Sequence, residues 1–322
     1  MSEKDITVPT TMKAISQDVL GGPDVLHEVE LPVPQPGPSE ILVRVRATAL
    51  NPTDWKHRAN QGMFLPAPPF VLGWDVSGEV VAVGFGVTLF QPGDEVFGML
   101  PYPHGHGAAA QYVTATARAF ARKPANLDHI QAAALPLTAL TAYQAIVDTA
   151  NVRAGQRVLI HAAAGGVGHV AVQIAKARGA YVIGTASAAN HDFLRGIGAD
   201  EVLDYRTTDF AEAVRDIDMV LDPIDSEHAL RSLRTLRPGG IVVLIRPTTT
   251  DQLHAEAERL RVRAVSLLVE ADHQGMNAIR ELAESGALRP TIAGAFPLAD
   301  AAKAHALGDT ARTVGKLVLT VD

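Results

Sequence analysis

The segment Ala162–Gly168 has the residue types that hold a phosphate group through backbone atoms. Its sequence is Ala-Ala-Ala-Gly-Gly-Val-Gly. Gly165 would let the backbone approach a pyrophosphate, and Gly168 would let a helix pack closely on a strand. Ala163 stands where the first glycine of such a run usually lies, and the additional Gly166 offsets this departure. The spacing predicts a dinucleotide-binding turn; a tight turn with a purely structural role is the alternative.

The elements on either side of this turn are those that a dinucleotide site requires. Arg157–His161 has the apolar run of a strand, and Val167–Arg178 continues as a helix with apolar residues on one face. The N-terminus of that helix would present N–H donors and the positive end of its dipole to an anion. The sequence therefore predicts a strand, a glycine-rich turn and a helix in the order that binds a dinucleotide.

Short runs of Val, Ile and Leu alternate with helical stretches from about residue 128 onward. This alternation predicts an α/β fold with a doubly wound parallel sheet. The predicted strands are Val158–Ile160, Tyr181–Ile183, Val202–Leu203, Met219–Leu221, Ile241–Ile245 and Ala264–Leu268.

The first third of the chain has the pattern of β structure. Ile41–Ala47 alternates apolar and polar residues as a half-buried strand does. Four glycines between residues 73 and 86 indicate a curved or barrel-like sheet in which backbones come close. The helix predicted over Asp272–Ser285 is followed by a short tail that ends in a strand-like run, Lys316–Val321. Because this tail is too short to make a domain alone, we expect it to pack onto the first third.

Composition excludes several classes of protein. The 322 residues include no cysteine, which excludes disulfides, thiolate catalysis and cysteine-ligated zinc. The net charge of -7 argues against general binding to nucleic acid or to an anionic membrane surface. No apolar run approaches the roughly 20 residues that span a bilayer. Residues 1–12 lack the apolar middle of a secretory signal, so we expect a cytoplasmic protein.

The chain resembles the zinc-free quinone oxidoreductase branch of the medium-chain dehydrogenase/reductase superfamily. The resemblance is carried by the glycine-rich turn and its flanks up to Tyr205, and by four shorter motifs. These motifs are Ala49–Asp54, Leu72–Glu79, Ala134–Ala142 and Gly315–Leu319. The resemblance implies a Rossmann domain inserted into a GroES-like β-barrel catalytic domain. The expected domains are residues 1–127, 128–270 and 271–322, the first and last forming the catalytic domain together.

The resemblance also implies an activity. Members reduce quinones or α,β-unsaturated carbonyls with NADPH, and they are usually homodimers. The residues expected to bind NADPH are Asn51, Thr138, Ala164, Gly165, Gly166, Val167, Thr185, Ser187, Tyr205 and Ile245. A nucleotide-binding protein without efficient turnover, with a redox-sensing or crystallin-like use of the same fold, is the alternative function.

The residues at the end of the second predicted strand favour NADPH over NADH. NAD-dependent enzymes usually place a carboxylate there for the ribose 2′-hydroxyl, and Gly184–Ser187 contains none. The hydroxyls of Thr185 and Ser187 can donate to a 2′-phosphate, and Tyr205 matches a phosphate-contacting tyrosine of the family. The family's basic residue after the serine is missing, because Ala189 and Asn190 stand there. Ser187 as a simple helix cap is the alternative, and the two roles are compatible.

Departures from the zinc-dependent relatives predict chemistry without a metal. Those relatives have a Gly-His-Glu segment where this chain has Gly73-Trp74-Asp75, and they carry ligand cysteines that are missing here. None of the five tyrosines has a lysine four positions later, which disfavours short-chain dehydrogenase chemistry. His104 and His106 would be a metal pair, but without a third ligand nearby we expect a loop. Asp222–Asp225 replaces a glycine-containing turn of the relatives.

Three residues near the first motif are the predicted catalytic residues. Hydride transfer to an enone or quinone places negative charge on the carbonyl oxygen, and a proton must follow. By resemblance, Asn51 contacts the nicotinamide ribose or the substrate, and Asp54 and Lys56 belong to the same segment. Lys56 would donate to the developing oxyanion. The alternatives are that Asn51-Pro52 starts a helix, that Lys56 is a solvated charge, and that solvent supplies the proton.

Overall fold

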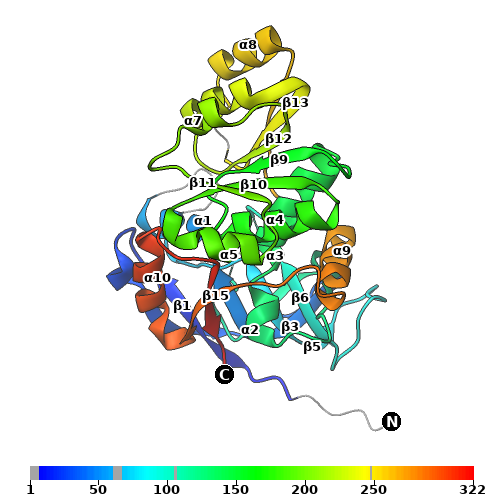
Figure 1. The fold of residues 1–322 in the computed structure, drawn as a ribbon. Coiled ribbons are helices and arrows are strands. Elements are labelled where there is room, and N and C mark those ends of the chain that lie inside the picture. The colour runs from blue at the N-terminus through cyan, green and yellow to red at the C-terminus, as the bar shows by residue number, and fades with distance from the viewer. Residues whose placement is uncertain (1–6, 61–66, 105–106, 247–248) are drawn as a thin grey trace. The chain divides into compact units, whose positions relative to one another are not determined.

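The structure is a computed structural model that describes residues 7–60, 67–104, 107–246 and 249–322 (Figure 1). The chain forms two compact units. Unit 1 consists of Met1–Leu137, Glu270–Glu284 and Pro290–Asp322. Unit 2 consists of Thr138–Val269 and Ser285–Arg289. Unit 1 is thus made from both ends of the chain, as the resemblance implies.

Unit 2 contains a parallel sheet of six strands in the order β11-β10-β9-β12-β13-β14. Each predicted strand of the doubly wound sheet is present, so this prediction is confirmed. The strands are β9 (Arg157–Ile160), β10 (Tyr181–Ala186), β11 (Glu201–Asp204), β12 (Ile217–Asp222), β13 (Leu236–Leu244) and β14 (Arg263–Ser266). The order reverses between β9 and β12, and in open α/β sheets ligands bind at that point, beyond the carboxyl ends of the strands.

Helices connect the strands of this sheet. They are α4 (Gly166–Ala177), α5 (His191–Gly196), α6 (Phe210–Ala213), α7 (Ser226–Ser232) and α8 (Asp251–Leu260). The central strands are buried on both faces. Leu159, Val220 and Val242 are fully buried in one apolar core, and their neighbours Val158, Leu221 and Val243, which point to the other face, are buried as well. Short runs of Val, Ile and Leu suit such strands because neither face meets water. The helix α3 (Pro136–Tyr143) begins at the end of unit 1 and runs into unit 2.

Unit 1 is built around β3, which pairs with β5, β7 and β16. The last strand β16 lies antiparallel to β3 with Leu317 opposite Leu50, and in Figure 1 it runs among the first strands of the chain. The predicted return of the tail to the first third is therefore confirmed. The strands are β1 (Thr11–Gln17), β2 (His27–Pro32), β3 (Glu40–Leu50), β4 (Phe70–Val71), β5 (Asp75–Val83), β6 (Glu95–Met99), β7 (Tyr112–Thr116), β8 (Phe120–Arg122), β15 (Ile292–Pro297) and β16 (Lys316–Thr320).

Close backbone contacts in this unit explain two of its glycines. A Cβ atom on Gly78 would collide with the backbone of Arg44, and one on Gly84 would collide with the backbone of Gly37. The predicted close approach of backbones is confirmed at these positions. The helices of unit 1 are α1 (Pro52–Ala59), α2 (His129–Ala133), α9 (His273–Glu284) and α10 (Ala301–Asp309).

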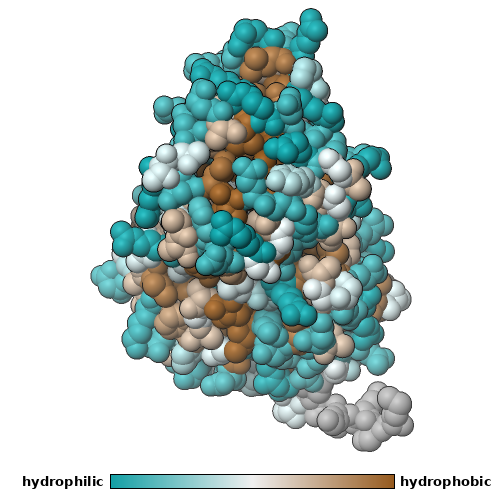
Figure 2. All heavy atoms as spheres, viewed as in Figure 1, coloured by the Kyte–Doolittle hydropathy of each residue, from teal (hydrophilic) through white to brown (hydrophobic). Residues whose placement is uncertain are grey.

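The surface is largely polar in the view of Figure 2, with hydrophobic residues in narrow strips. In the part of the chain that the structure describes, no helix combines the length and the apolar character needed to cross a bilayer.

Candidate functional site

The turn between β9 and α4 has the conformation that the sequence predicts, with one difference. A Cβ atom on Gly168 would lie 2.7 Å from the Cα atom of Ala163, so only glycine allows this packing. Gly165 is the N-cap residue of α4 with φ -76°, which any residue can adopt. A positive φ therefore does not require glycine at position 165. The residue with positive φ is Ala162, at 48°.

Gly165 nevertheless lies where a ligand would approach the backbone. Its amide donates to the carbonyl oxygen of Ala162 over 2.9 Å. A Cβ atom there would meet only that oxygen, at 3.2 Å. The predicted residues Ala164, Gly166 and Val167 occupy the same turn and the first positions of α4. The first N–H groups of α4 have no partner within the helix, which makes this end suited to an anion.

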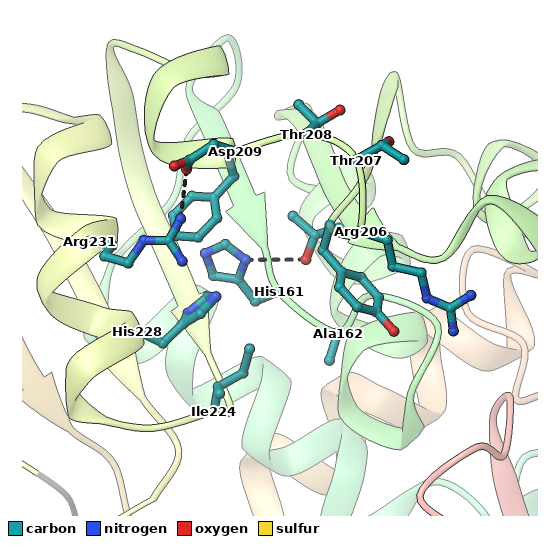
Figure 3. Close-up of a pocket in the computed structure, with 12 residues that line it drawn as sticks. His161, Ala162, Arg206, Thr207, Thr208, Asp209, Ile224, His228 and Arg231 are labelled. Carbon is teal, nitrogen blue, oxygen red and sulfur yellow. Dashed lines mark hydrogen bonds and ion pairs between the residues drawn. The ribbon is translucent and has the colours of Figure 1, made fainter.

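A pocket with a volume of about 560 Å³ opens at the carboxyl ends of β9, β10, β11 and β12 (Figure 3). Thr185 and Tyr205 are the predicted cofactor-binding residues that line it. The complete lining is His161, Ala162, Thr185, Tyr205, Arg206, Thr207, Thr208, Asp209, Phe210, Ile224, His228 and Arg231. This position, beside the glycine-rich turn, is where a doubly wound sheet binds its ligand.

Charged groups border this pocket on two sides. Arg231 pairs with Asp209 at 2.7 Å and lies over the Phe210 ring. The guanidinium of Arg206 lies over the Tyr205 ring, 5.7 Å from its centroid. Among the described residues, no carboxylate is within ion-pair distance of the Arg206 guanidinium. Figure 3 shows Arg206 and Arg231 on opposite sides of His161. Arg206 therefore offers a cation at the rim that sequence reasoning missed, although it directly follows Tyr205.

The edge of the pocket near Ser187 differs from the expected one. Ser187 precedes the turn Ala188–Asn190, and its side chain makes no capping hydrogen bond. Its hydroxyl oxygen accepts from the Asn190 amide at 3.4 Å. The Asp204 carboxylate accepts the Ala188 N–H at 3.3 Å and the Arg206 N–H at 2.9 Å. The sequence analysis looked for a carboxylate only at the end of β10 and missed Asp204 at the end of β11.

A buried hydrogen-bond network forms the floor of the pocket. The His161 imidazole contacts the Thr185 hydroxyl at 3.2 Å and the Ser232 hydroxyl at 3.1 Å. His228 Nδ1 lies 2.8 Å from the Asp222 carboxylate. Burial, with a contribution from His228, lowers the pKa of His161 to about 3, so this imidazole is neutral at pH 7. The Thr185 hydroxyl, predicted to meet a phosphate, is thus already in contact with His161.

Asp222 is ionised within this network. Burial alone would raise the pKa of its carboxyl, but the hydrogen bond from His228 and the neighbouring imidazoles hold it below its ordinary value. Its other oxygen accepts the Ile224 N–H at 2.9 Å. Asp225 caps α7 by accepting the His228 N–H at 2.9 Å. The glycine-free segment Asp222–Asp225 therefore forms a capped turn, and Ile224 gives the pocket an apolar wall.

The same network has the residue types of a metal site, but both ring nitrogens of His161 and Nδ1 of His228 already have hydrogen-bond partners. Nitrogen and oxygen atoms of His161, Asp222 and His228 lie within 4.8 Å of one another. The two imidazole rings are nearly perpendicular, with centroids 4.3 Å apart. Two imidazoles on one tetrahedral Zn²⁺ would have centroids about 5 Å apart, because each Zn–N bond is about 2 Å. We interpret these residues as a hydrogen-bonded network, and the absence of a bound metal stays a prediction.

In unit 1, the predicted catalytic residues lie on and before α1. Asn51 is the N-cap residue of this helix, so the predicted helix start is confirmed. The Asp54 carboxylate accepts the Asn51 N–H at 2.7 Å and the Gly73 N–H at 3.0 Å. Asn51 and Asp54 are fully buried, whereas Lys56 is exposed. The three residues share one segment, but only Lys56 presents its side chain at the surface.

The side chain of Asn51 belongs to a second buried polar network. Its Nδ2 atom donates to the Asp75 carboxylate over 2.8 Å, and its Oδ1 atom accepts from Lys316. Lys316 Nζ also donates to the Leu50 carbonyl oxygen over 2.8 Å. The sequence analysis considered Asp75 only as part of the segment that replaces Gly-His-Glu of the zinc-dependent relatives. It considered Lys316 only as part of the motif Gly315–Leu319.

The charges of this second network are closely coupled. Burial, and then the charge of Asp75, raise the pKa of Asp54 to about 7 against two backbone hydrogen bonds and Lys316. Burial also raises the pKa of Asp75. Burial lowers the pKa of Lys316, while the two carboxylates oppose this. One lysine cation thus faces two buried carboxyl groups, one of which titrates near neutral pH.

The remaining predicted residues, Thr138 and Ile245, are next to members of these two networks. Thr138 is buried in α3, and Ile245 follows β13, where its N–H donates to the Asp222 carbonyl oxygen over 3.2 Å. His106, the second histidine of the possible metal pair, is outside the described residues.

Comparisons with known proteins match both parts of the chain. Residues 37–125 match the family model described as alcohol dehydrogenase GroES-like domain, and residues 197–319 match the one described as zinc-binding dehydrogenase. The chloroplast envelope quinone oxidoreductase homolog of Arabidopsis thaliana is 33% identical over 93% of this chain and 95% of its own length. The chain belongs to the quinone oxidoreductase branch of the medium-chain dehydrogenases/reductases.

Solved structures agree with this assignment. The quinone oxidoreductase from Coxiella burnetii is 36% identical, with a TM-score of 0.90 over 97% of this chain and 100% of that one. The CurK enoyl reductase is 28% identical, with a TM-score of 0.86 over 98% and 100%. The predicted fold, a Rossmann-like parallel sheet together with a GroES-like domain, is confirmed. This protein is an oxidoreductase of a superfamily that binds nicotinamide cofactors.

Proposed function

We propose that this oxidoreductase uses NADPH to reduce a quinone or an α,β-unsaturated carbonyl compound, without zinc. The observation that carries the proposal is the pocket beside the glycine-rich turn, with Tyr205 and Arg206 at its rim. The relatives named quinone oxidoreductase and enoyl reductase support the substrate class. The chain has no cysteine, so it lacks the thiolate ligands of the zinc-dependent relatives.

The nucleotide would be held by unit 2. The N–H groups at the start of α4 would bind the pyrophosphate, next to Gly165 and Gly166. The adenosine would occupy the pocket against Ile224, and Arg206 would pair with the 2′-phosphate. A guanidinium forms charge-assisted, bidentate hydrogen bonds with phosphate, so Arg206 replaces the basic residue missing at positions 189 and 190. The Ser187 hydroxyl accepts a hydrogen bond from Asn190, so its own proton can be donated to the same 2′-phosphate.

The substrate would be handled by unit 1. NADPH, when bound, supplies the hydride. Lys56, exposed on α1, would donate a hydrogen bond to the substrate oxygen as negative charge develops there. Asn51 and Asp54 are buried at the start of α1, and we propose that they act by fixing that helix. Solvent would deliver the final proton.

Two further properties belong to this proposal. We propose a homodimer in the cytoplasm, on the resemblance and on the sequence composition. The Arabidopsis thaliana relative is named for the chloroplast envelope, so location within this branch varies.

The test is the loss of NADPH absorbance with purified protein and a panel of quinones, enones and enoyl thioesters. Turnover with at least one acceptor is expected, and it should persist after dialysis against a chelator. Tight NADPH binding without reduction of any acceptor would instead favour a nucleotide-binding protein with a sensing or crystallin-like role. Turnover that a chelator abolishes and zinc restores would contradict zinc independence.

A further inference from the structure

The side chain of Lys316 is held beneath the start of α1 by the pairing of β16 with β3. Lys316 is the first residue of β16, and its neighbour Leu317 lies opposite Leu50, the last residue of β3. Its ammonium contacts the Leu50 carbonyl oxygen, the Asn51 side-chain oxygen and, at 3.4 Å, the Asp75 carboxylate. An ammonium has three N–H donors, so this set of acceptors uses all of them.

These contacts fix the Asn51 side chain at both ends. Lys316 binds its oxygen, and Asp75 accepts from its nitrogen over 2.8 Å. The other oxygen of Asp75 accepts the Leu137 N–H at 2.6 Å, near the start of α3. One buried cation therefore connects the chain entering α1 with the chain entering α3.

Lys316 also supplies the only positive charge in this group of described residues. Its exposed fraction is 3%, and those of Asp54 and Asp75 are 0%. A buried charge is tolerated when it is paired and hydrogen-bonded, and removing one partner leaves the other uncompensated. Loss of the ammonium would leave two carboxyl groups without a cation, directly beneath the N-terminus of α1.

We propose that Lys316 is a positioning residue, which acts on the reaction by holding Asn51 and thereby α1. The effect on turnover rests on the proposed function, in which Lys56 on this helix meets the substrate. A small displacement of a reacting group costs about 10²-fold in rate. Loss of the contacts that hold α1 should therefore have a measurable effect on kcat.

The experiment compares three variants in the full chain. Lys316→Met removes the charge and keeps the apolar stem. Lys316→Met combined with Asp75→Asn removes both charges of the pair. If the Asn51 amide group turns over, its oxygen can accept from the new amide in place of the hydrogen bond that Asn51 Nδ2 now donates to Asp75. Lys303→Met is the matched control, because Lys303 is exposed and pairs only with Asp300 in the same C-terminal segment.

Two measurements carry the comparison. Amide hydrogen exchange over residues 51–59 reports on α1, and NADPH titration reports on unit 2. For Lys316→Met we expect exchange in α1 to rise about tenfold or more and kcat to fall by about 10²-fold, while the Kd for NADPH stays within about twofold. The double variant should recover part of both losses, and the control should match wild type.

Several results separate this inference from the proposed function. If wild type reduces no acceptor, the proposed function fails, and exchange in α1 alone decides the role of Lys316. Unchanged exchange in α1, or faster exchange with unchanged kcat in an active enzyme, overturns the inference. If Lys316→Met does not fold, the double variant decides: wild-type exchange and kcat in that folded protein would show that the pair has no positioning role.

Discussion

The Arg206 guanidinium lies over the Tyr205 ring at the rim of the pocket proposed for the nucleotide, 5.7 Å from the ring centroid. The two side chains come from consecutive residues directly after β11, so a short segment presents an aromatic face and a cation together. The stacking leaves the guanidinium edge available for a phosphate group.

Arg206→Ala should therefore weaken NADPH binding by about tenfold and leave NADH binding nearly unchanged, because only NADPH has a 2′-phosphate to pair with the guanidinium. The measurement is the Kd of each nucleotide by fluorescence titration. Arg195→Ala is the control, since Arg195 is exposed on α5 of the same unit and pairs with Asp192. Equal losses for both nucleotides would contradict the assigned role.

Ser187→Asp should erase or reverse the preference for NADPH. A new carboxylate would face the 2′-phosphate from the end of β10, close to Asp204, which already accepts the Ala188 N–H. The measurement is kcat/KM for NADPH and NADH in both proteins. A wild type that prefers NADH, or a variant that keeps its NADPH preference, would show that the residues at the end of β10 do not distinguish the ribose 2′-phosphate from the 2′-hydroxyl.

Valine at the two key glycines of the turn should give opposite results. Gly165→Val should keep the fold, because its φ is permissive and its Cβ would meet only the Ala162 oxygen, and it should lose NADPH binding, because the valine methyl groups would take the space proposed for the pyrophosphate. Gly168→Val should lower the Tm or prevent folding, because the added atoms would overlap the Ala163 backbone. Thermal unfolding and NADPH titration distinguish the two. Unchanged NADPH affinity in folded Gly165→Val would refute the assignment of the turn.

Asp54 should make the stability depend on pH below neutrality. Burial raises its pKa from 3.8 to about 7, so the folded protein holds this proton more tightly than the unfolded chain. The favourable contribution of the proton is therefore present at low pH and is lost as pH rises toward about 7. Asp54→Asn cannot titrate, so it should be most destabilised relative to wild type near about pH 5 and less so near about pH 8.

The comparison with the variant is needed because other groups oppose this trend. Burial lowers the pKa of His161 to about 3 and that of His305 to about 4, and both favour the folded state as pH rises. Denaturant unfolding of both proteins across this range gives the difference directly. A stability difference that is constant with pH would contradict the raised pKa.

The central strands of the parallel sheet were predictable because they are buried on both faces and their sequences are short and apolar. β9 and β12 show this, with Val158–Ile160 and Met219–Leu221 in the expected places. The edge strands β11 and β14 are only partly buried, and the alternation of strands with helices indicated them. The glycine-rich turn was predictable because local sterics dictate Gly168. The positive φ at Ala162 was missed, since alanine does not indicate a left-handed conformation.

The two polar networks were not predictable from local pattern. Lys316 and Asp75 are 241 positions apart in sequence, and the pairing of β3 with both β16 and β5 brings them together. The motif around Asn51 indicated a site, but periodicity cannot show that its side chain is buried and bonded to a lysine from the last strand. Arg206 directly follows Tyr205 in the sequence, but its exposure, and the fact that no carboxylate of the described residues pairs with it, are properties of the fold.

The pairing of β16 with β3 also dictates an order of events during synthesis. The parallel sheet of unit 2 is complete once β14 has left the ribosome, whereas residues 47–50 of β3 must wait for residues 316–320 before they pair with β16. This part of the β3 edge therefore stays unpaired during the translation of most of the chain, and an unpaired edge is a site for aggregation or chaperone binding. Slowed translation after β14 would prolong that exposure without affecting the folding of the parallel sheet.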